Sequence, residues 1–227
     1  MFAYIDTFSN LIPIFLFFLY RKTKNEFKGV RLIILYLLCS FLITYSLKYT
    51  QDNYPGFYRD LYVILSEVST FIEYGMFAGF IYYQLKSNTA KKLLLISIAA
   101  FSIFLVIFNV FFKVETFIDS IPIGVETILI LGFGFYFLYE QTNDTTTLFI
   151  YTKPAFWVIF GIILYLAGSF FIYIFANYTT KKIISQYWFV TNIASIIKNI
   201  FFCIAIFINA KPSKESIKYN LELSQLN

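Results

Sequence analysis

Histidine is absent from this chain of 227 residues, and cysteine occurs only twice. Without histidine there is no imidazole base, no histidine metal ligand and no phosphoacceptor histidine. Cys39 and Cys203 both lie in apolar runs, where a thiol packs as a small hydrophobic group. Two such residues form neither a disulfide framework nor a zinc site. The sequence therefore predicts no metal site and no catalytic residue.

Charged residues are also scarce, at 14% of the chain, whereas 59% of the residues are hydrophobic and 22% are aromatic. A water-soluble protein of this size needs a far more polar surface. Apolar runs of about twenty residues match a bilayer core about 30 Å thick, which a helix crosses at about 1.5 Å per residue. These features predict an all-α, polytopic membrane protein, whose first expected partner is the lipid bilayer.

Seven apolar segments are expected to cross the membrane and to form a seven-helix bundle over residues 1–210. Their predicted bounds are 4–20, 31–48, 61–85, 93–112, 118–139, 155–176 and 188–209. Residues 211–227 are expected to form a short cytoplasmic tail. Because this tail is too short for a kinase or a DNA-binding domain, any signal is expected to leave through another protein.

The basic residues predict the orientation of the bundle. The connections after the first, third and fifth spans, together with the tail, hold twelve Lys and Arg residues, whereas the opposite side holds five. The positive-inside rule then places the N-terminus outside and the C-terminus in the cytoplasm. The net charge of +5 lies in short flanks of the spans and not on one broad face, so no nucleic-acid partner is expected.

Four charged residues are predicted to share one depth in the membrane. Asp6, Glu73, Glu126 and Lys198 lie in the first, third, fifth and seventh spans, each roughly 20 Å above the cytoplasmic edge. A charge in the bilayer centre costs about 2.5–3.5 kcal/mol even on lenient scales, so such groups usually face a partner or a cavity. We expect Lys198 to pair with Glu73 or Glu126, and at least one acid to be neutral or hydrated.

Other polar residues near this layer are candidates to complete a ligand or ion pocket, namely Tyr45, Asn192 and Asn199. Glu67 and Asp119 lie nearer the outer surface and are candidates for the mouth of such a pocket. The alternative is structural: a Lys and a Glu can hold helices together without any ligand.

Prolines and glycines mark points where the predicted helices bend or approach each other. Pro13 and Pro122 lie in the first and fifth spans, where proline removes an N–H and can kink a helix. Gly75 and Gly79 form a G-x-x-x-G pattern in the third span, which permits close approach of a neighbouring helix.

A lysine in the seventh span of a seven-span protein resembles microbial rhodopsins, in which such a lysine holds retinal as a Schiff base. Lys198 is the residue that carries this resemblance. The third span, Leu61 through Leu85, lacks the Arg and Asp-Trp pattern expected around a rhodopsin counterion, although Glu73 can take that place. Because that pattern is missing, no cofactor is expected, and absorbance after growth with retinal tests for a chromophore on Lys198.

The chain also resembles two other classes of membrane protein, which leave a transporter and a lipid-modifying enzyme as alternatives. Seven spans in this length resemble small sugar transporters, but the chain has no Pro-Gln dipeptide. Midplane charges and proline-broken helices are nevertheless features of carriers of small solutes or protons. Membrane lipid hydrolases of the lysoplasmalogenase type share the length and the aromatic richness, although the chain has no recognisable motif of paired carboxylates.

The last span begins Trp188-Phe189-Val190 and continues with a stretch from Asn192 to Phe202. Together with the overall layout, this resembles small bacterial seven-helix proteins that accompany two-component sensor kinases. The resemblance implies that the outer layer binds a small molecule or senses the state of the membrane, and that the bundle passes a helix shift to a partner protein. We therefore expect a membrane receptor or sensor, and the resemblance implies that it lies in a bacterial inner (cytoplasmic) membrane. The alternatives are a small-solute or proton-coupled transporter, an assembly scaffold without a ligand, and a lipid-modifying enzyme.

Overall fold

The computed structural model describes residues 2–20, 27–111, 120–143, 149–175 and 181–210, and every element in these ranges is a helix. The helices are α1 (Phe2–Ser9), α2 (Leu11–Tyr20), α3 (Val30–Asn53), α4 (Pro55–Gln84), α5 (Asn88–Phe111), α6 (Ser120–Thr142), the short 3-10 helix η1 (Ile150–Thr152), α7 (Pro154–Phe175) and α8 (Lys181–Ala210). The predicted tail, 211–227, and Asp119 lie outside the described residues.

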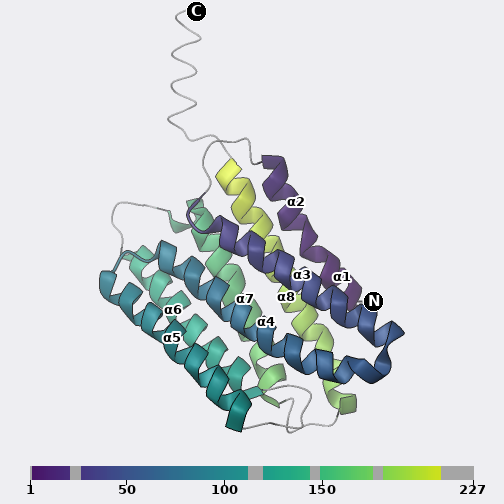
Figure 1. Cartoon of the computed structure of the whole chain (residues 1–227). Coiled ribbons are helices and arrows are strands. Elements are labelled where there is room, and N and C mark those ends of the chain that lie inside the picture. Colours follow the sequence, from purple (N-terminus) through teal and green to yellow (C-terminus); the bar gives the residue numbers. More distant parts are fainter. Residues whose placement is uncertain (1, 21–26, 112–119, 144–148, 176–180, 211–227) are drawn as a thin grey trace, which may run out of the picture.

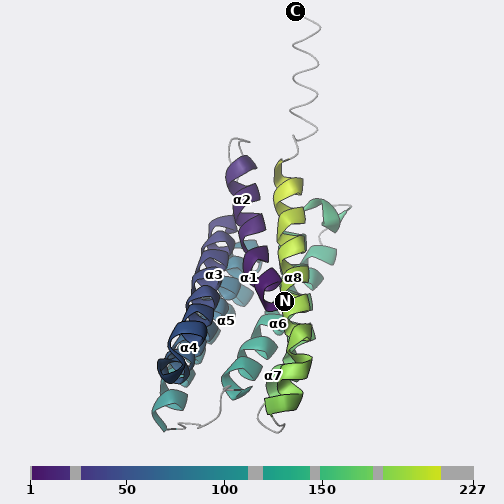
Figure 2. The same ribbon diagram turned by 90° about the vertical axis from the view of Figure 1, so that its right-hand side faces the viewer.

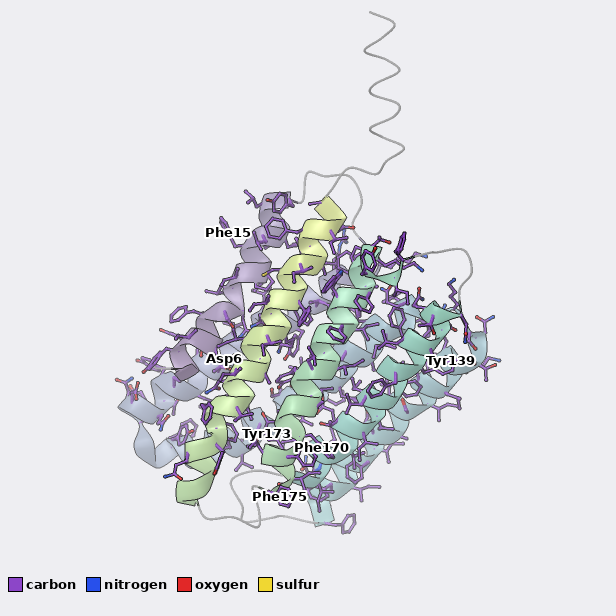
Figure 3. All side chains as sticks on the ribbon, turned by 180° about the vertical axis from the view of Figure 1, so that it is seen from behind. Asp6, Phe15, Tyr139, Phe170, Tyr173 and Phe175 are labelled. Atoms are coloured by element: carbon purple, nitrogen blue, oxygen red, sulfur yellow. The ribbon has the colours of Figure 1, made fainter. Side chains whose placement is uncertain are left out.

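Six of the described helices, α3 to α8, are long and apolar enough to cross a membrane. At most 39% of the apolar stretch of each is buried inside the bundle. The outward side chains are large and apolar: Phe111 is 75% exposed, and Phe15 and Tyr139 point away from the bundle (Figure 3). Such an exposed apolar surface suits contact with lipid. The all-helical architecture is thus confirmed, and it is consistent with a multi-pass integral membrane protein.

The long helices lie roughly side by side, and consecutive ones run in opposite directions (Figure 1). Viewed from the side, α3 and α4 lie on one side of the bundle and α7 and α8 on the other (Figure 2). The pair α1 and α2 packs against both α8 and α3. The end of α2 reaches the end of α8, where the ring centroids of Tyr20 and Phe207 are 5.4 Å apart.

The first predicted span forms two helices, because α1 ends at Ser9 and α2 begins at Leu11. Pro13 explains this break: it has no N–H to donate to the carbonyl of Ser9, and its ring would clash with that carbonyl in a continuous helix. The side chain of Asn10 donates to the Thr7 carbonyl at 3.4 Å, near the end of α1. α1 begins partway along α8 (Figure 1), so the described part of the first span is shorter than the six long helices.

Pro122 has no such effect on the fifth predicted span. It lies in the first turn of α6, and the helix runs from Ser120 to Thr142 as one element. Residues in the first turn of a helix donate no intrahelical hydrogen bond, so proline is tolerated there.

The bundle has two halves of different character, divided near the middle of the long helices. The half away from the turn at Tyr54 between α3 and α4, called the packed half below, is filled by buried apolar side chains. These include Ile33, Ile34, Leu37, Phe77, Phe80, Ile81, Leu94, Ile130, Phe137, Ile159, Ile162, Phe202 and Ala205. The half that contains the α3–α4 turn is called the cavity half, for the reason given below.

Close contact between α7 and α8 depends on glycine. A Cβ added to Gly161 would lie 2.8 Å from Phe201 Cβ and 3.3 Å from the carbonyl oxygen of Lys198. Seven residues further along α7, a Cβ on Gly168 would lie 3.2 Å from Ala194 Cβ. Small residues on one face of α7 therefore let α8 approach closely and fix the backbone of Lys198.

The G-x-x-x-G pattern of α4 acts through only one of its glycines. A Cβ added to Gly79 would lie 3.1 Å from Leu32 Cδ1 on α3, but a Cβ on Gly75 would meet nothing within 4 Å.

Candidate functional site

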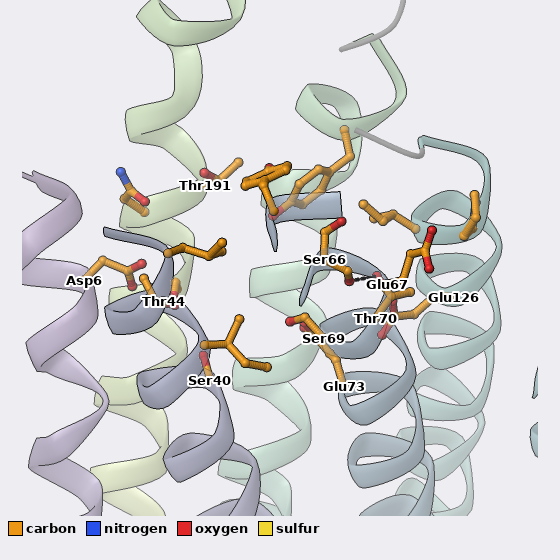
Figure 4. Close-up of a pocket in the computed structure, with 18 of the residues that line it drawn as sticks. Asp6, Ser40, Thr44, Ser66, Glu67, Ser69, Thr70, Glu73, Glu126 and Thr191 are labelled. Atoms are coloured by element: carbon orange, nitrogen blue, oxygen red, sulfur yellow. Dashed lines mark hydrogen bonds between the residues drawn. The ribbon is translucent and has the colours of Figure 1, made fainter. Parts of the chain in front are cut away.

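The cavity half encloses a space of about 450 Å³ between the helices. α1, α3, α4, α6, α7 and α8 all contribute side chains to its wall, and α5 adds Leu105 and Asn109. Most of its lining residues carry a polar group, and the carboxylates and hydroxyl groups labelled in Figure 4 come from several helices around the space. It extends to Gln51, which is exposed close to the α3–α4 turn.

Lys198 lies at the inner part of this cavity and is only 1% exposed. Its Nζ atom donates a hydrogen bond to Tyr36 Oη at 2.6 Å. It also lies 4.6 Å from the centroid of the Tyr36 ring and 4.2 Å from that of Tyr165. Two aromatic rings therefore stabilise the ammonium group by cation–π attraction in addition to the hydrogen bond.

A row of charged groups crosses the cavity. Lys48 interacts electrostatically with Asp6, and Asp6 with Lys198. Lys198 also interacts with Glu73, and Glu73 with Glu126. The signs along the row are therefore positive, negative, positive, negative and negative, so the last carboxylate has a neighbour of its own sign.

The surroundings of the carboxylates differ along this row. Glu73 faces the hydroxyl groups of Tyr36 and Tyr165 as well as the Lys198 ammonium group. Asp6 faces the Ser195 hydroxyl. Among the described residues, Glu126 Oε1 is buried without any hydrogen-bond partner, and the same holds for one oxygen each of Asp6 and Glu73. Lys198 was predicted to pair with Glu73 or Glu126; in the structure its electrostatic neighbours are Glu73 and Asp6, and it donates a hydrogen bond to the Tyr36 phenol.

Five of the seven residues predicted for a pocket line this cavity: Asp6, Glu73, Glu126, Asn192 and Lys198. Glu67, expected near a mouth, also lines it, and its Oε2 atom accepts a hydrogen bond from Asn109 Nδ2 at 3.1 Å. The structure thus gathers the predicted charged layer at one place.

The other two predicted residues lie elsewhere. Asn199 is buried but faces α1, where its Nδ2 atom donates to Ser9 Oγ at 2.7 Å and to Asn10 Oδ1 at 3.1 Å. It neighbours Lys198 in sequence, so the helix turns its side chain to a different face. Tyr45 is 52% exposed on the outer face of α3 and is not part of the cavity lining. Equal depth in the membrane did not reveal which way these two side chains point.

The sequence did not point to Tyr36 and Tyr165, although both contact Lys198. A signal was present, because Tyr165 lies in the middle of an apolar span and Tyr36 lies inside another, among aliphatic residues. Tyrosine usually lies at the membrane interface, where its hydroxyl group reaches water, so a tyrosine in mid-span needs a polar partner.

Lys48 was also missed as a cavity residue, because it lies at the predicted end of the second span and was counted only as a topology signal. In the structure its Nζ atom donates to Thr7 Oγ1 at 2.5 Å, and it lies 4.3 Å from the centroid of the Tyr4 ring.

Aromatic side chains form the part of the cavity wall nearest the α3–α4 turn. The ring centroids of Tyr58 and Tyr62 are 5.8 Å apart on α4. Across the cavity, those of Tyr173 and Trp188 are also 5.8 Å apart. All four residues line the space. The site thus combines buried charge with aromatic faces, an arrangement suited to binding a small molecule.

Among the described residues, no three acidic or cysteine side chains converge closely enough to hold a metal ion. Comparison with models of protein families, with curated protein sequences and with solved structures found nothing that matches this chain.

Proposed function

We propose that this chain is a seven-helix membrane receptor that binds a small polar molecule in its cavity half and signals through a separate partner protein. In this proposal the first segment completes the seven spans, the N-terminus lies outside and the C-terminus lies in the cytoplasm. The cavity half then faces outward, where a ligand can enter from the exterior. The observation that carries the proposal is the cavity itself, which gathers Asp6, Glu73, Glu126 and Lys198 from four different helices.

The packed half supports a receptor over a simple passage for solutes. Below the cavity, Phe77, Phe80 and Ile81 of α4 and Phe202 of α8 are at most 1% exposed. Buried aromatic and aliphatic groups of this size leave little room for a solute to continue through the bundle. Binding on one side of a closed bundle is the arrangement that a receptor requires.

The bundle offers a route for the signal. Lys198 lines the cavity, and its backbone lies at the point where α8 packs against Gly161 of α7. A ligand that displaces Lys198 or its neighbours therefore acts directly on this helix pair. A ligand shifts the helices only if it binds one arrangement better than the other.

Copurification tests the proposal. The protein is purified in mild detergent, and native mass spectrometry identifies any small molecule that remains bound. Ser69 lines the cavity, so Ser69→Leu is expected to reduce the bound fraction. Ser102→Leu on α5 is the matched control, because Ser102 is not part of the lining. In parallel, crosslinking in membranes should recover a partner protein with the wild-type chain. A bound molecule that both variants retain equally would place its binding outside this cavity and contradict the proposal.

Transport of a small solute is the second candidate, and the break between α1 and α2 favours it. The break lies inside the bundle, next to Asn199 of α8, and carriers use such broken helices close to their binding sites. Uptake of the copurified molecule into proteoliposomes would support a carrier. Binding without uptake, together with recovery of a partner, would support the receptor.

A further inference from the structure

The two ends of the cavity differ in charge. Both lysines of the lining, Lys48 and Lys198, interact with Asp6, on the side where α1, α3 and α8 meet. At the other end, α4, α5 and α6 contribute Glu67 and Glu126, and no described residue of these three helices adds a lysine or arginine to the lining. Figure 4 shows Glu67 and Glu126 together at one side of the space and Asp6 at the opposite side.

The formal charges along the row leave one carboxylate, Glu126, without a lysine or arginine neighbour among the described lining residues. Lys48 and Lys198 balance two carboxylates, Asp6 and Glu73, which are their neighbours in the row. Glu126 follows Glu73 in that row, and no described lining residue supplies a cation for it. An isolated buried carboxylate is costly, so the site favours a ligand that brings a positive charge.

Glu126 is placed to receive such a ligand. The residue is 3% exposed, its Oε1 atom has no hydrogen-bond partner among the described residues, and its side chain lines the cavity. An unpartnered carboxylate oxygen is an acceptor that an N–H donor of an ammonium group can satisfy. Thr70, beside it in Figure 4, is already bonded to the Ser66 carbonyl at 3.1 Å.

We infer that the ligand is a small organic ammonium ion, whose charged nitrogen binds Glu126 at the acidic end of the cavity. This inference rests on the proposed function and adds the chemical class of the ligand. A volume of about 450 Å³ is far more than a bare metal ion occupies and lies in the range of organic ligand sites. The faces of Tyr62 and Tyr173, which line the same space, attract an organic cation and its carbon skeleton.

The test uses three probes of similar shape and different charge: 2-phenylethylammonium, the neutral 2-phenylethanol and the anion 3-phenylpropionate. Their binding to the full-length protein in lipid nanodiscs is measured by calorimetry. The ammonium ion is expected to bind at least about tenfold more tightly than the alcohol, because the alcohol O–H can also donate to the Glu126 carboxylate but brings no positive charge to it. The anion is expected not to bind.

Variants of single carboxylates test which negative charge causes the preference for the ammonium ion. Glu126→Gln keeps the shape of the side chain and is expected to weaken ammonium binding by about tenfold or more, without weakening binding of the alcohol. Asp52→Asn is the matched control, since Asp52 is exposed on α3 outside the cavity and its loss should leave affinity unchanged. Glu126→Asp retains the charge and should retain the preference for the ammonium ion. Equal elution in size-exclusion chromatography shows that each variant is folded.

Each other outcome overturns the inference in a different way. If the alcohol or the anion binds as tightly as the ammonium ion, and Ser69→Leu abolishes that binding, the cavity binds ligands but is not specific for cations. If Glu126→Gln retains full ammonium affinity, Glu126 is not the anchor. Displacement of the ammonium ion by an equal concentration of sodium ions would indicate an inorganic cation site. If no probe binds and no molecule copurifies, the proposed function fails as well.

Discussion

Helix α4 passes through both halves of the bundle, and its two halves have opposite roles. From Phe77 to Ile81 its buried side chains are apolar and fully buried. From Tyr58 to Glu73 its inward side chains are polar or aromatic and line the cavity. The same backbone therefore closes one half of the bundle and builds a charged site in the other.

The comparison shows that membrane depth alone does not decide how polar the interior of a bundle is. In the packed half, apolar side chains fill the space and van der Waals contact holds the helices together. In the cavity half, the charges keep a space open, because they can be buried only beside partners or water. Substitutions in the packed half should therefore change mainly stability, whereas substitutions in the cavity half should change ligand binding as well.

The largest expected effect is at Lys198 in the cavity half. Lys198→Met leaves Asp6 and Glu73 without the cation between them, and we expect the free energy of unfolding to fall by about 3–5 kcal/mol. Unfolding by a denaturing detergent, followed by circular dichroism, measures the change. The double variant Lys198→Met, Glu73→Gln should recover part of the loss, because one uncompensated charge has been removed. Glu73→Gln alone completes the cycle, and losses of the two single variants that simply add up in the double variant would show that the two charges do not interact.

A similar loss is expected in the packed half without any change of charge. Phe77 is fully buried, and Phe77→Ala should lower the free energy of unfolding by about 3–5 kcal/mol because it leaves a cavity. Phe71→Ala, on the same helix but 52% exposed, is the control and should cost much less in the same unfolding assay. Equal losses of unfolding free energy at both positions would mean that burial of Phe77 stabilises the bundle no more than the exposed Phe71 does.

An intermediate effect is expected where α7 and α8 meet. Gly161→Ala places a methyl group 2.8 Å from Phe201 Cβ, so α8 must shift, and we expect a loss of about 1–3 kcal/mol. Gly132→Ala, whose Cβ would meet nothing within 4 Å, should be neutral or slightly stabilising. Because Lys198 follows the shift, Gly161→Ala should also weaken binding of the copurified molecule. Unchanged stability and unchanged binding would contradict the close helix contact.

The smallest expected effect has the opposite sign. Glu126→Gln removes a buried carboxylate that lacks a counterion, so we expect the free energy of unfolding to rise by about 1 kcal/mol while ammonium binding weakens. Thermal unfolding in the absence of any added amine measures the change, with Asp52→Asn as the exposed control. A clear loss of stability would instead make Glu126 a structural residue, held by an interaction in the folded bundle.

Much of the site could be predicted from individual residues. Asp6, Glu73, Glu126 and Lys198 were placed at one depth by counting along each span, and the structure brings all four to one cavity. Counting could not orient Asn199 or Tyr45, because a difference of one position turns a helical side chain by about 100°. Nor could it find Gly161, whose importance depends on Phe201 and Lys198 of another helix.

The amino-acid sequence by itself determined that the chain is helical and apolar enough for a membrane, because apolar runs of this length and scarce charge leave no other stable arrangement of the backbone in lipid. Pro13 and Pro122 marked two spans as places where a helix can bend, but the structure decided that the first span breaks after Ser9 and that α6 stays one helix. Only the tertiary structure decided which half of the bundle is packed and which contains a cavity. That division depends on side chains from six or more helices meeting in space, and no single span carries this information.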